Sequence, residues 1–370
     1  ISSKLRTSGK GNYSMWPKFR NHVKYLNATA QEDSMAKTKK TGKSGKKRRK
    51  HAGPAPRGAS PGTAHPQAAR FSRFDTERVN LKVGKLIEGK SFKDMDELNS
   101  FVNKAMNDGT LDARESWPEG MDDPVEAAQE LAFQSMEEDN DRKALDLARK
   151  ALSLAPDCVD ARVVEIQITV DDADKRVNAC KNLLAQAREK MGREFFEENR
   201  GHFWGVVTTR PYMRALEYLT HLLMSMERYD EAGAVMEEMI DLNPNDNQGV
   251  RDTLLGLYLG EGDVLKARSL LNKYPDDNLA VFSWGRAIER FLSGDMQAAS
   301  KALEDALYAN PHVLAGMAGI EEMPDDFDGS YSPGDIHEAW YCLIELGPVW
   351  EKQPDVTTWI ASELPGLIGT

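Results

Sequence analysis

Residues 229–246 read YDEAGAVMEEMIDLNPND, and the fold prediction rests on the pattern in this stretch. Ala232, Met236 and Met239 recur at spacings of four and three residues, so they share one face if the stretch is helical. Pro244 follows, and proline cannot continue a helix because it lacks an N–H and its ring clashes with the preceding turn. The stretch therefore predicts an amphipathic helix that ends before Pro244.

A small residue, further apolar residues and a terminal proline recur in this order along the chain. The other instances are Ala144, Ala148, Ala151 and Pro156, then Ala267, Leu271 and Pro275, then Ala299, Leu303, Ala306 and Pro311. Ala232, Ala267 and Ala299 are 35 and 32 residues apart, close to the period of about 34 residues of tetratricopeptide helical hairpins. We therefore predict an all-α array of such hairpins, an α-solenoid, rather than a non-repeating bundle whose alanines recur by chance.

The predicted array begins near residue 121 and ends near residue 320. One unit covers about 125–158, an irregular insertion continues to about 210, and three units follow, of which the first covers about 213–246 and the second ends early. Pro124 suits a first helical turn that is capped by Asp122 or Asp123. Residues 74–120 are expected to form an N-terminal helical segment, with a helix over 92–107, and residues 321–370 a set of capping helices. Within residues 74–120, apolar and polar residues alternate over Val79–Val83, as they do in a β-strand.

The N-terminal residues differ sharply from the rest of the chain in charge. Residues 1–70 hold 17 of the 48 lysines and arginines but only two acidic residues, so they carry about +15, and the remainder carries about −26. Residues 35–73 are basic and of low complexity, which predicts disorder. Residues 1–34 are interpreted as a disordered upstream extension, because Met35 opens a plausible start. The cluster Lys46, Lys47, Arg48, Arg49 and Lys50 is a candidate site for RNA, DNA or an anionic membrane. The alternatives are a tail that solubilises the chain or rests on its own acidic body and, in a eukaryotic source, a nuclear-import signal.

Three stretches are more specific than the general repeat. They read LARKALSLAPDCVDA at 147–161, GHFWG at 201–205 with TRPYMRA at 209–215, and LNPNDNQGVR at 242–251. Together they resemble a family of bacterial tetratricopeptide proteins of unknown biochemical role, some of whose members are named as homologues of the eukaryotic suppression-of-tumorigenicity-seven protein. The resemblance covers about 120–355 and departs at Thr208, where an acidic residue is expected. It implies no catalytic residues.

A candidate partner-binding site lies around the insertion and the following unit. Arg214 and Arg251 are expected near the starts of consecutive first helices, where two guanidinium groups could bind the carboxylate of an acidic peptide. The alternative is structural ion pairs with Asp246, Asp252 or Glu217. The remaining candidates are Arg210, Tyr212 and Trp204; Phe203-Trp204 is either an aromatic anchor for a partner or a plug against the helix over 174–192. The Lys and Asn residues with which chaperone-tail clamps of this repeat class bind their peptides are not recognisable.

The sequence shows no catalytic or cofactor motif, so the prediction is a non-catalytic protein-interaction scaffold without cofactors. The alternative is a nucleic-acid-associated protein that binds through its basic tail. No phosphate loop, nucleophile elbow or HExxH motif occurs, and His337 and Cys342 are five residues apart, which does not suit a metal site. No apolar run is long enough for a membrane span, so no membrane insertion is expected. Three scattered cysteines predict reduced thiols and a cytoplasmic location.

Overall fold

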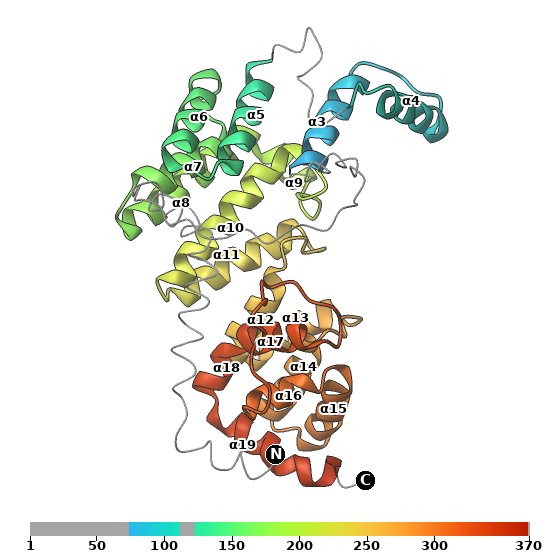
Figure 1. The fold of residues 1–370 in the computed structure, drawn as a ribbon, viewed down its shortest axis with the longest axis vertical. Coiled ribbons are helices and arrows are strands. Elements are labelled where there is room, and N and C mark those ends of the chain that lie inside the picture. The colour runs from blue at the N-terminus through green and yellow to red at the C-terminus, as the bar shows by residue number, and fades with distance from the viewer. Residues whose placement is uncertain (1–73, 112–122, 369–370) are drawn as a thin grey trace, which may run out of the picture. The chain divides into compact units, whose positions relative to one another are not determined.

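The computed structural model describes residues 74–111 and 123–368. Every regular element in these residues is a helix, as the sequence predicts (Figure 1). The predictions for the basic cluster and for residues 1–73 lie outside the described part. The chain divides after Val170 into two compact units. We call them the N-terminal unit, described over 74–111 and 123–170, and the C-terminal unit, described over 171–368.

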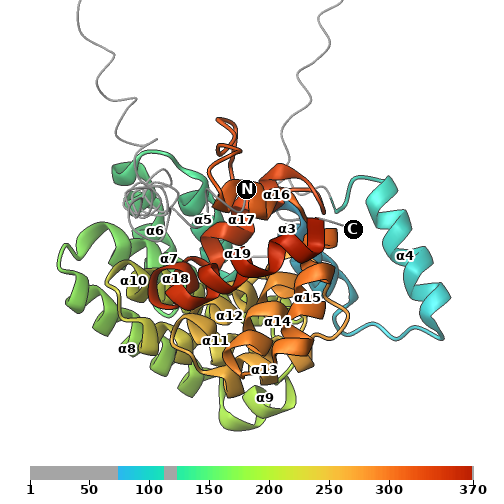
Figure 2. The same cartoon turned by 90° about the horizontal axis from the view of Figure 1, so that it is seen from below.

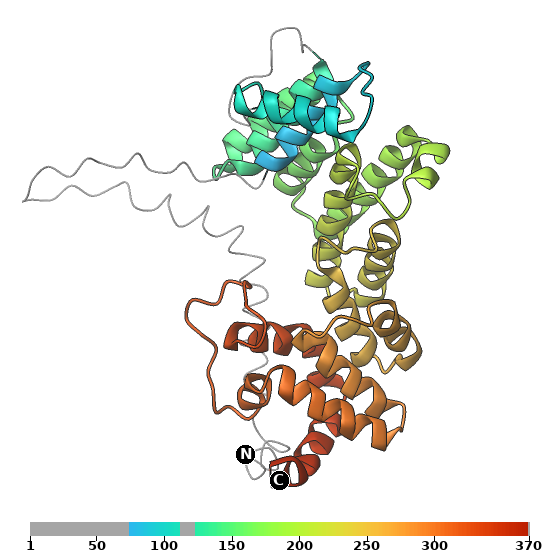
Figure 3. The same cartoon turned by 90° about the vertical axis from the view of Figure 1, so that its right-hand side faces the viewer.

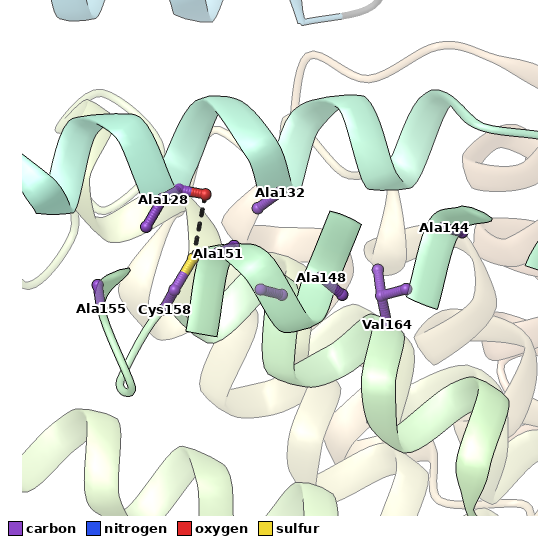
Figure 4. Close-up of a cluster of buried hydrophobic side chains, with 9 residues drawn as sticks. Ala128, Ala132, Ala144, Ala148, Ala151, Ala155, Cys158 and Val164 are labelled. Atoms are coloured by element: carbon purple, nitrogen blue, oxygen red, sulfur yellow. Dashed lines mark hydrogen bonds between the residues drawn. The ribbon is translucent and has the colours of Figure 1, made fainter. Parts of the chain in front are cut away.

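The N-terminal unit contains α3 (Asp75–Ile87), α4 (Met95–Asn107), α5 (Pro124–Glu137), α6 (Asp141–Leu154) and α7 (Val159–Thr169). Helices α5, α6 and α7 pack against each other around a core of small side chains that includes Ala128, Ala132, Ala144, Ala148 and Ala151 (Figure 4). Because an alanine side chain ends at Cβ, these helices approach closely. Asp123 caps α5 as predicted, since its carboxylate accepts from Val125 N at 2.9 Å.

Helix α3 corrects the strand-like interpretation of Val79–Val83. The alternation of apolar residues is accompanied by a charged face that the helix turns towards α5: Arg78 pairs with Glu130 at 2.9 Å and with Glu137 at 3.0 Å. A short alternating run does not distinguish a strand from a helix whose charged face is also buried. The helix predicted over 92–107 is confirmed as α4, with Asp94 accepting a capping bond from Glu97 N.

The C-terminal unit begins with α8 (Ala173–Met191), α9 (Arg193–Glu198) and the 3-10 helix η2 (Val207–Thr209). Three helical pairs follow: α10 (Arg210–Ser225) with α11 (Tyr229–Leu242), α12 (Val250–Gly260) with α13 (Val264–Lys273), and α14 (Ala280–Leu292) with α15 (Met296–Ala309). The predicted repeat alanines Ala232, Ala267 and Ala299 are fully buried in the second helix of each pair. Neighbouring pairs pack through α11 on α12 and α13 on α14, as in a stack of hairpins.

The last part of the unit consists of α16 (His312–Met317), α17 (Ile336–Glu345), α18 (Gly347–Lys352) and α19 (Pro354–Ile368). These helices do not simply extend the stack. Helix α18 packs on α12, and α17 packs on α12 and α14, the first helices of the second and third pairs (Figures 2 and 3). The red C-terminal helices α17 and α18 therefore lie beside the first helices of these two pairs.

Two glycines of α12 explain how close this contact is. A Cβ atom on Gly256 would lie 1.9 Å from Glu345 O, and a Cβ on Gly260 would lie 2.6 Å from Pro348 Cβ. Only glycine leaves room for the backbone of the α17–α18 junction at these positions. Gly256 and Gly260 are one helical turn apart, so they form a flat strip along α12 on which the junction rests.

Candidate interaction surface

Arg251, a predicted partner-binding residue, lies in the first turn of α12 and already has partners within the chain. Its Nη2 is 2.7 Å from Asp277 Oδ2 and its Nε is 4.0 Å from Asp246 Oδ2. The guanidinium also lies over the ring of Tyr274, at 4.8 Å from its centroid. The contact with Asp246 is one of the structural ion pairs that the sequence offered as the alternative. The Arg251 side chain nevertheless keeps 25% of its surface exposed.

That exposed part of Arg251 faces a cleft of about 620 Å³ at the loop between α13 and α14. The cleft is also lined by Lys273, Tyr274, Pro275, Asp276, Asp277, Asn278, Leu279 and Pro333. Its two cationic groups, Arg251 and Lys273, lie beside the acidic groups of the loop, so a ligand carboxylate would compete with Asp277 for Arg251. A ligand carboxylate can therefore bind Arg251 only by replacing Asp277, whereas Lys273 donates only to the Ile240 carbonyl oxygen at 3.4 Å.

Arg286 of α14 fixes the loop that forms one side of this cleft. Its guanidinium donates to the carbonyl oxygens of Tyr274 at 3.1 Å, Pro275 at 3.1 Å and Asp277 at 2.6 Å. Tyr274 in turn donates its hydroxyl to Pro244 O at 2.7 Å. The second pair ends early at Pro275, as predicted, and Arg286 donates hydrogen bonds to the carbonyl oxygens of the loop that follows.

The predicted aromatic residues of the insertion divide between the core and the surface. Phe203 is fully buried, and its ring packs with those of Phe196 at 4.8 Å and Tyr212 at 6.1 Å. Tyr212 is 4% exposed and donates its hydroxyl to Glu238. Arg188 of α8 lies 4.1 Å from the Phe196 ring. This cluster corresponds to the plug against the helix over 174–192, and it leaves Trp204 half-buried at its edge.

Trp204 and Arg210 hold each other in place at the start of α10. Arg210 Nε donates to Trp204 O at 2.8 Å, and its guanidinium lies 5.3 Å from the Trp204 ring. Arg214 follows one turn later on α10 and is half-buried. The structure thus places Trp204, Arg210 and Arg214 at one end of α10, whereas Arg251 lies on α12. Their role in partner binding stays a prediction.

Two carboxyl groups that no sequence pattern indicates, those of Asp252 and Glu345, lie where α17 packs on α12. Asp252 Oδ2 accepts from the Tyr341 hydroxyl at 3.3 Å, and Glu345 Oε2 accepts from Thr253 at 2.6 Å. The rings of Tyr341 and Tyr331 lie 4.9 Å apart at the same place. Burial and the neighbouring Glu345 and Asp277 raise the pKa of Asp252 to about 8, and burial raises the pKa of Glu345. No sequence signal marks this pair of carboxyl groups, because they come from segments about 90 positions apart.

Other site types find no support in the described residues. Over 74–111 and 123–368, no group of three or more His, Cys, Asp and Glu side chains is arranged to hold a metal ion. The three cysteines are buried, and burial raises the pKa of Cys180 to about 11. Within the same ranges, no helix is both long and apolar enough to cross a membrane.

Comparison with known families supports the hairpin geometry. Residues 219–246, which cover the C-terminal part of α10 and all of α11, match the family model described as tetratricopeptide repeat. The chain carries a tetratricopeptide repeat. No curated protein matches the chain. Repeats of this class are in general protein-interaction modules and are generally non-catalytic, so the match supports a protein partner.

Proposed function

We propose that this tetratricopeptide-repeat chain is a non-catalytic scaffold that holds a protein partner on its helical array. The observation that carries this proposal is the stack of three helical pairs, α10–α15, of which the first matches the tetratricopeptide repeat. A stack of hairpins buries its core between neighbouring pairs and leaves an extended surface for other chains. The resemblance to bacterial relatives of the suppression-of-tumorigenicity-seven protein belongs to the same proposal.

The partner surface that we propose centres on the start of α10 and extends to the cleft beside α12. Trp204, Arg210 and Arg214 supply an indole and two guanidinium groups at the start of α10, and Arg251 and Lys273 add cationic groups at the cleft. Arginine and tryptophan are the residue types that contribute most to binding when a partner covers them. An acidic peptide suits this surface, because guanidinium groups bind carboxylates through paired hydrogen bonds.

The test is partner capture by the double variant Arg214→Glu plus Arg251→Glu. Reversal of both charges should reduce recovery of the partners captured by the wild-type chain by at least tenfold, because the glutamate at each position would repel an acidic peptide. Lys150→Glu plus Lys301→Glu is the matched control, since both lysines are exposed and lie on α6 and α15. Thermal unfolding of every variant separates lost binding from the lost Arg251–Asp277 pair. Unchanged recovery by a folded double variant would refute the arginine surface.

A further inference from the structure

Arg251 is held in a fixed position at the cleft beside α12, yet its capacity for hydrogen bonds is only partly used. The guanidinium lies 4.8 Å from the ring centroid of Tyr274 and 5.6 Å from that of Phe282. The backbone N–H of Arg251 donates to the Asp246 carboxylate at 3.0 Å, which fixes the first turn of α12. Within the described residues, the guanidinium contacts carboxylates at Asp277 Oδ2 (2.7 Å) and Asp246 Oδ2 (4.0 Å), so most of its five N–H donors remain available.

Asp277 is the carboxylate that pairs with this guanidinium, and the match between the two groups is incomplete. The buried Oδ2 of Asp277 lies 2.7 Å from Arg251 Nη2, but within the described part of the chain it accepts no hydrogen bond of good geometry. The other oxygen, Oδ1, accepts from Leu279 N at 3.1 Å in its own turn. Asp277 therefore does not form the paired hydrogen bonds with which a free carboxylate binds a guanidinium.

The backbone at Asp277 is fixed independently of this ion pair. Arg286 donates to the Asp277 carbonyl oxygen at 2.6 Å, so the loop keeps its course when the carboxylate changes its partner. Replacement of Asp277 at Arg251 then requires the rotation of one side chain. The cleft of about 620 Å³ borders both side chains and offers a second, exposed cation, Lys273. The cleft thus has room and charge for a carboxylate that the chain does not itself supply.

We propose that Asp277 is an internal competitor at this cleft: its carboxylate occupies the place on Arg251 that a side-chain carboxylate of an acidic peptide takes. Asp277 thereby lowers the affinity of the cleft for such peptides. A ligand has to offset the ion pair that it breaks, so peptides of low negative charge are excluded. This inference rests on the proposed scaffold function and adds the residue that sets the affinity of one part of the partner surface.

The affinity of the full chain for hexaglutamate with an amidated C-terminus and a neutral fluorescent label tests this competition. Fluorescence anisotropy at low ionic strength measures the binding, since salt screens exposed charges. Asp277→Asn should tighten binding by about tenfold, because a ligand carboxylate then displaces no charged partner from Arg251. Asp277→Ser, whose hydroxyl also suits this turn, should show the same gain. Hexaglutamine, which carries no charge, should show none.

Asp276→Asn is the matched control, because Asp276 is exposed and lines the same cleft. It removes the same charge one residue away and leaves the ion pair between Arg251 and Asp277 in place. A general rise in positive potential would tighten binding in both variants, whereas competition tightens it in Asp277→Asn alone. Arg251→Gln plus Asp277→Asn should bind hexaglutamate no better than Arg251→Gln, since the competitor acts through this arginine.

The proposal is overturned if Asp277→Asn and Asp277→Ser, shown to be folded by thermal unfolding, bind hexaglutamate no more tightly than the wild type. It is also overturned if Asp276→Asn gains as much, or if the gain persists without Arg251. Absence of hexaglutamate binding in every variant would overturn it too, because the cleft would then not be a carboxylate site. None of these results decides the partner-capture experiment, so failure of the competition and failure of the scaffold proposal are distinguishable.

Discussion

At the scale of single residues, arginines of the C-terminal unit stabilise carbonyl oxygens and a carboxylate of the loop between α13 and α14, which lie outside the helices. Arg286 donates to three carbonyl oxygens of the loop between α13 and α14, and Arg251 neutralises Asp277 of the same loop. A guanidinium can do this because its donors are spread over a planar fork. An arginine that a sequence pattern marks as available for a partner can therefore be engaged within the chain.

Arg286→Ala should destabilise the C-terminal unit by about 2–3 kcal/mol, because three carbonyl oxygens lose a charged donor together. The measurement is urea unfolding followed by circular dichroism. Arg286→Lys should recover only part of the loss, since a lysine ammonium cannot span three carbonyls in this arrangement. If Arg286→Ala unfolds at the wild-type urea concentration, water replaces the arginine at no cost and the loop does not depend on it.

At the scale of helices, α12 shows how one element serves two contacts. Its leucines Leu254, Leu255, Leu257 and Leu259 are buried within the stack, while Gly256 and Gly260 face the α17–α18 junction. Glycine normally weakens a helix interior by about 1 kcal/mol relative to alanine. Its presence twice on one face of α12 is explained by the backbone atoms of Glu345 and Pro348 that lie against it.

Gly256→Ala should therefore destabilise the chain although alanine is the better helix former. The added Cβ would meet Glu345 O at 1.9 Å, so α17 has to shift, at a cost of about 1–3 kcal/mol that exceeds the gain in helix propensity. Gly84→Ala in α3 is the matched control, because no atom lies within 4 Å of its added Cβ. Thermal unfolding compares the two, and a stabilised Gly256→Ala would mean that α17 does not rest on α12.

At the scale of the whole molecule, the sequence predicts the helices better than their tertiary contacts. The predicted helix ends before Pro156, Pro244 and Pro311 are confirmed, because a proline or a capping side chain acts locally; Asp123, for example, accepts from Val125 N. The packing of α17–α18 on α12 could not be predicted. Nothing in the sequence around Gly256 indicates that the backbone of Glu345, a distant residue, lies against it. The proximity of Asp252 and Glu345 could not be predicted for the same reason.

The repeat architecture also predicts how far a local defect spreads. Ala148 is fully buried in the N-terminal unit among the alanines of α5 and α6, so Ala148→Leu should push these helices apart and cost about 1–3 kcal/mol. In an array whose units contact mainly their neighbours, that cost remains near its origin. Hydrogen exchange should therefore show lower protection in α5–α7 and wild-type protection in α14 and α15. An equal loss of protection in α5–α7 and in α14–α15 would show that the chain unfolds as one cooperative unit. Its free energy of unfolding would then not be a sum of contributions from neighbouring helical pairs.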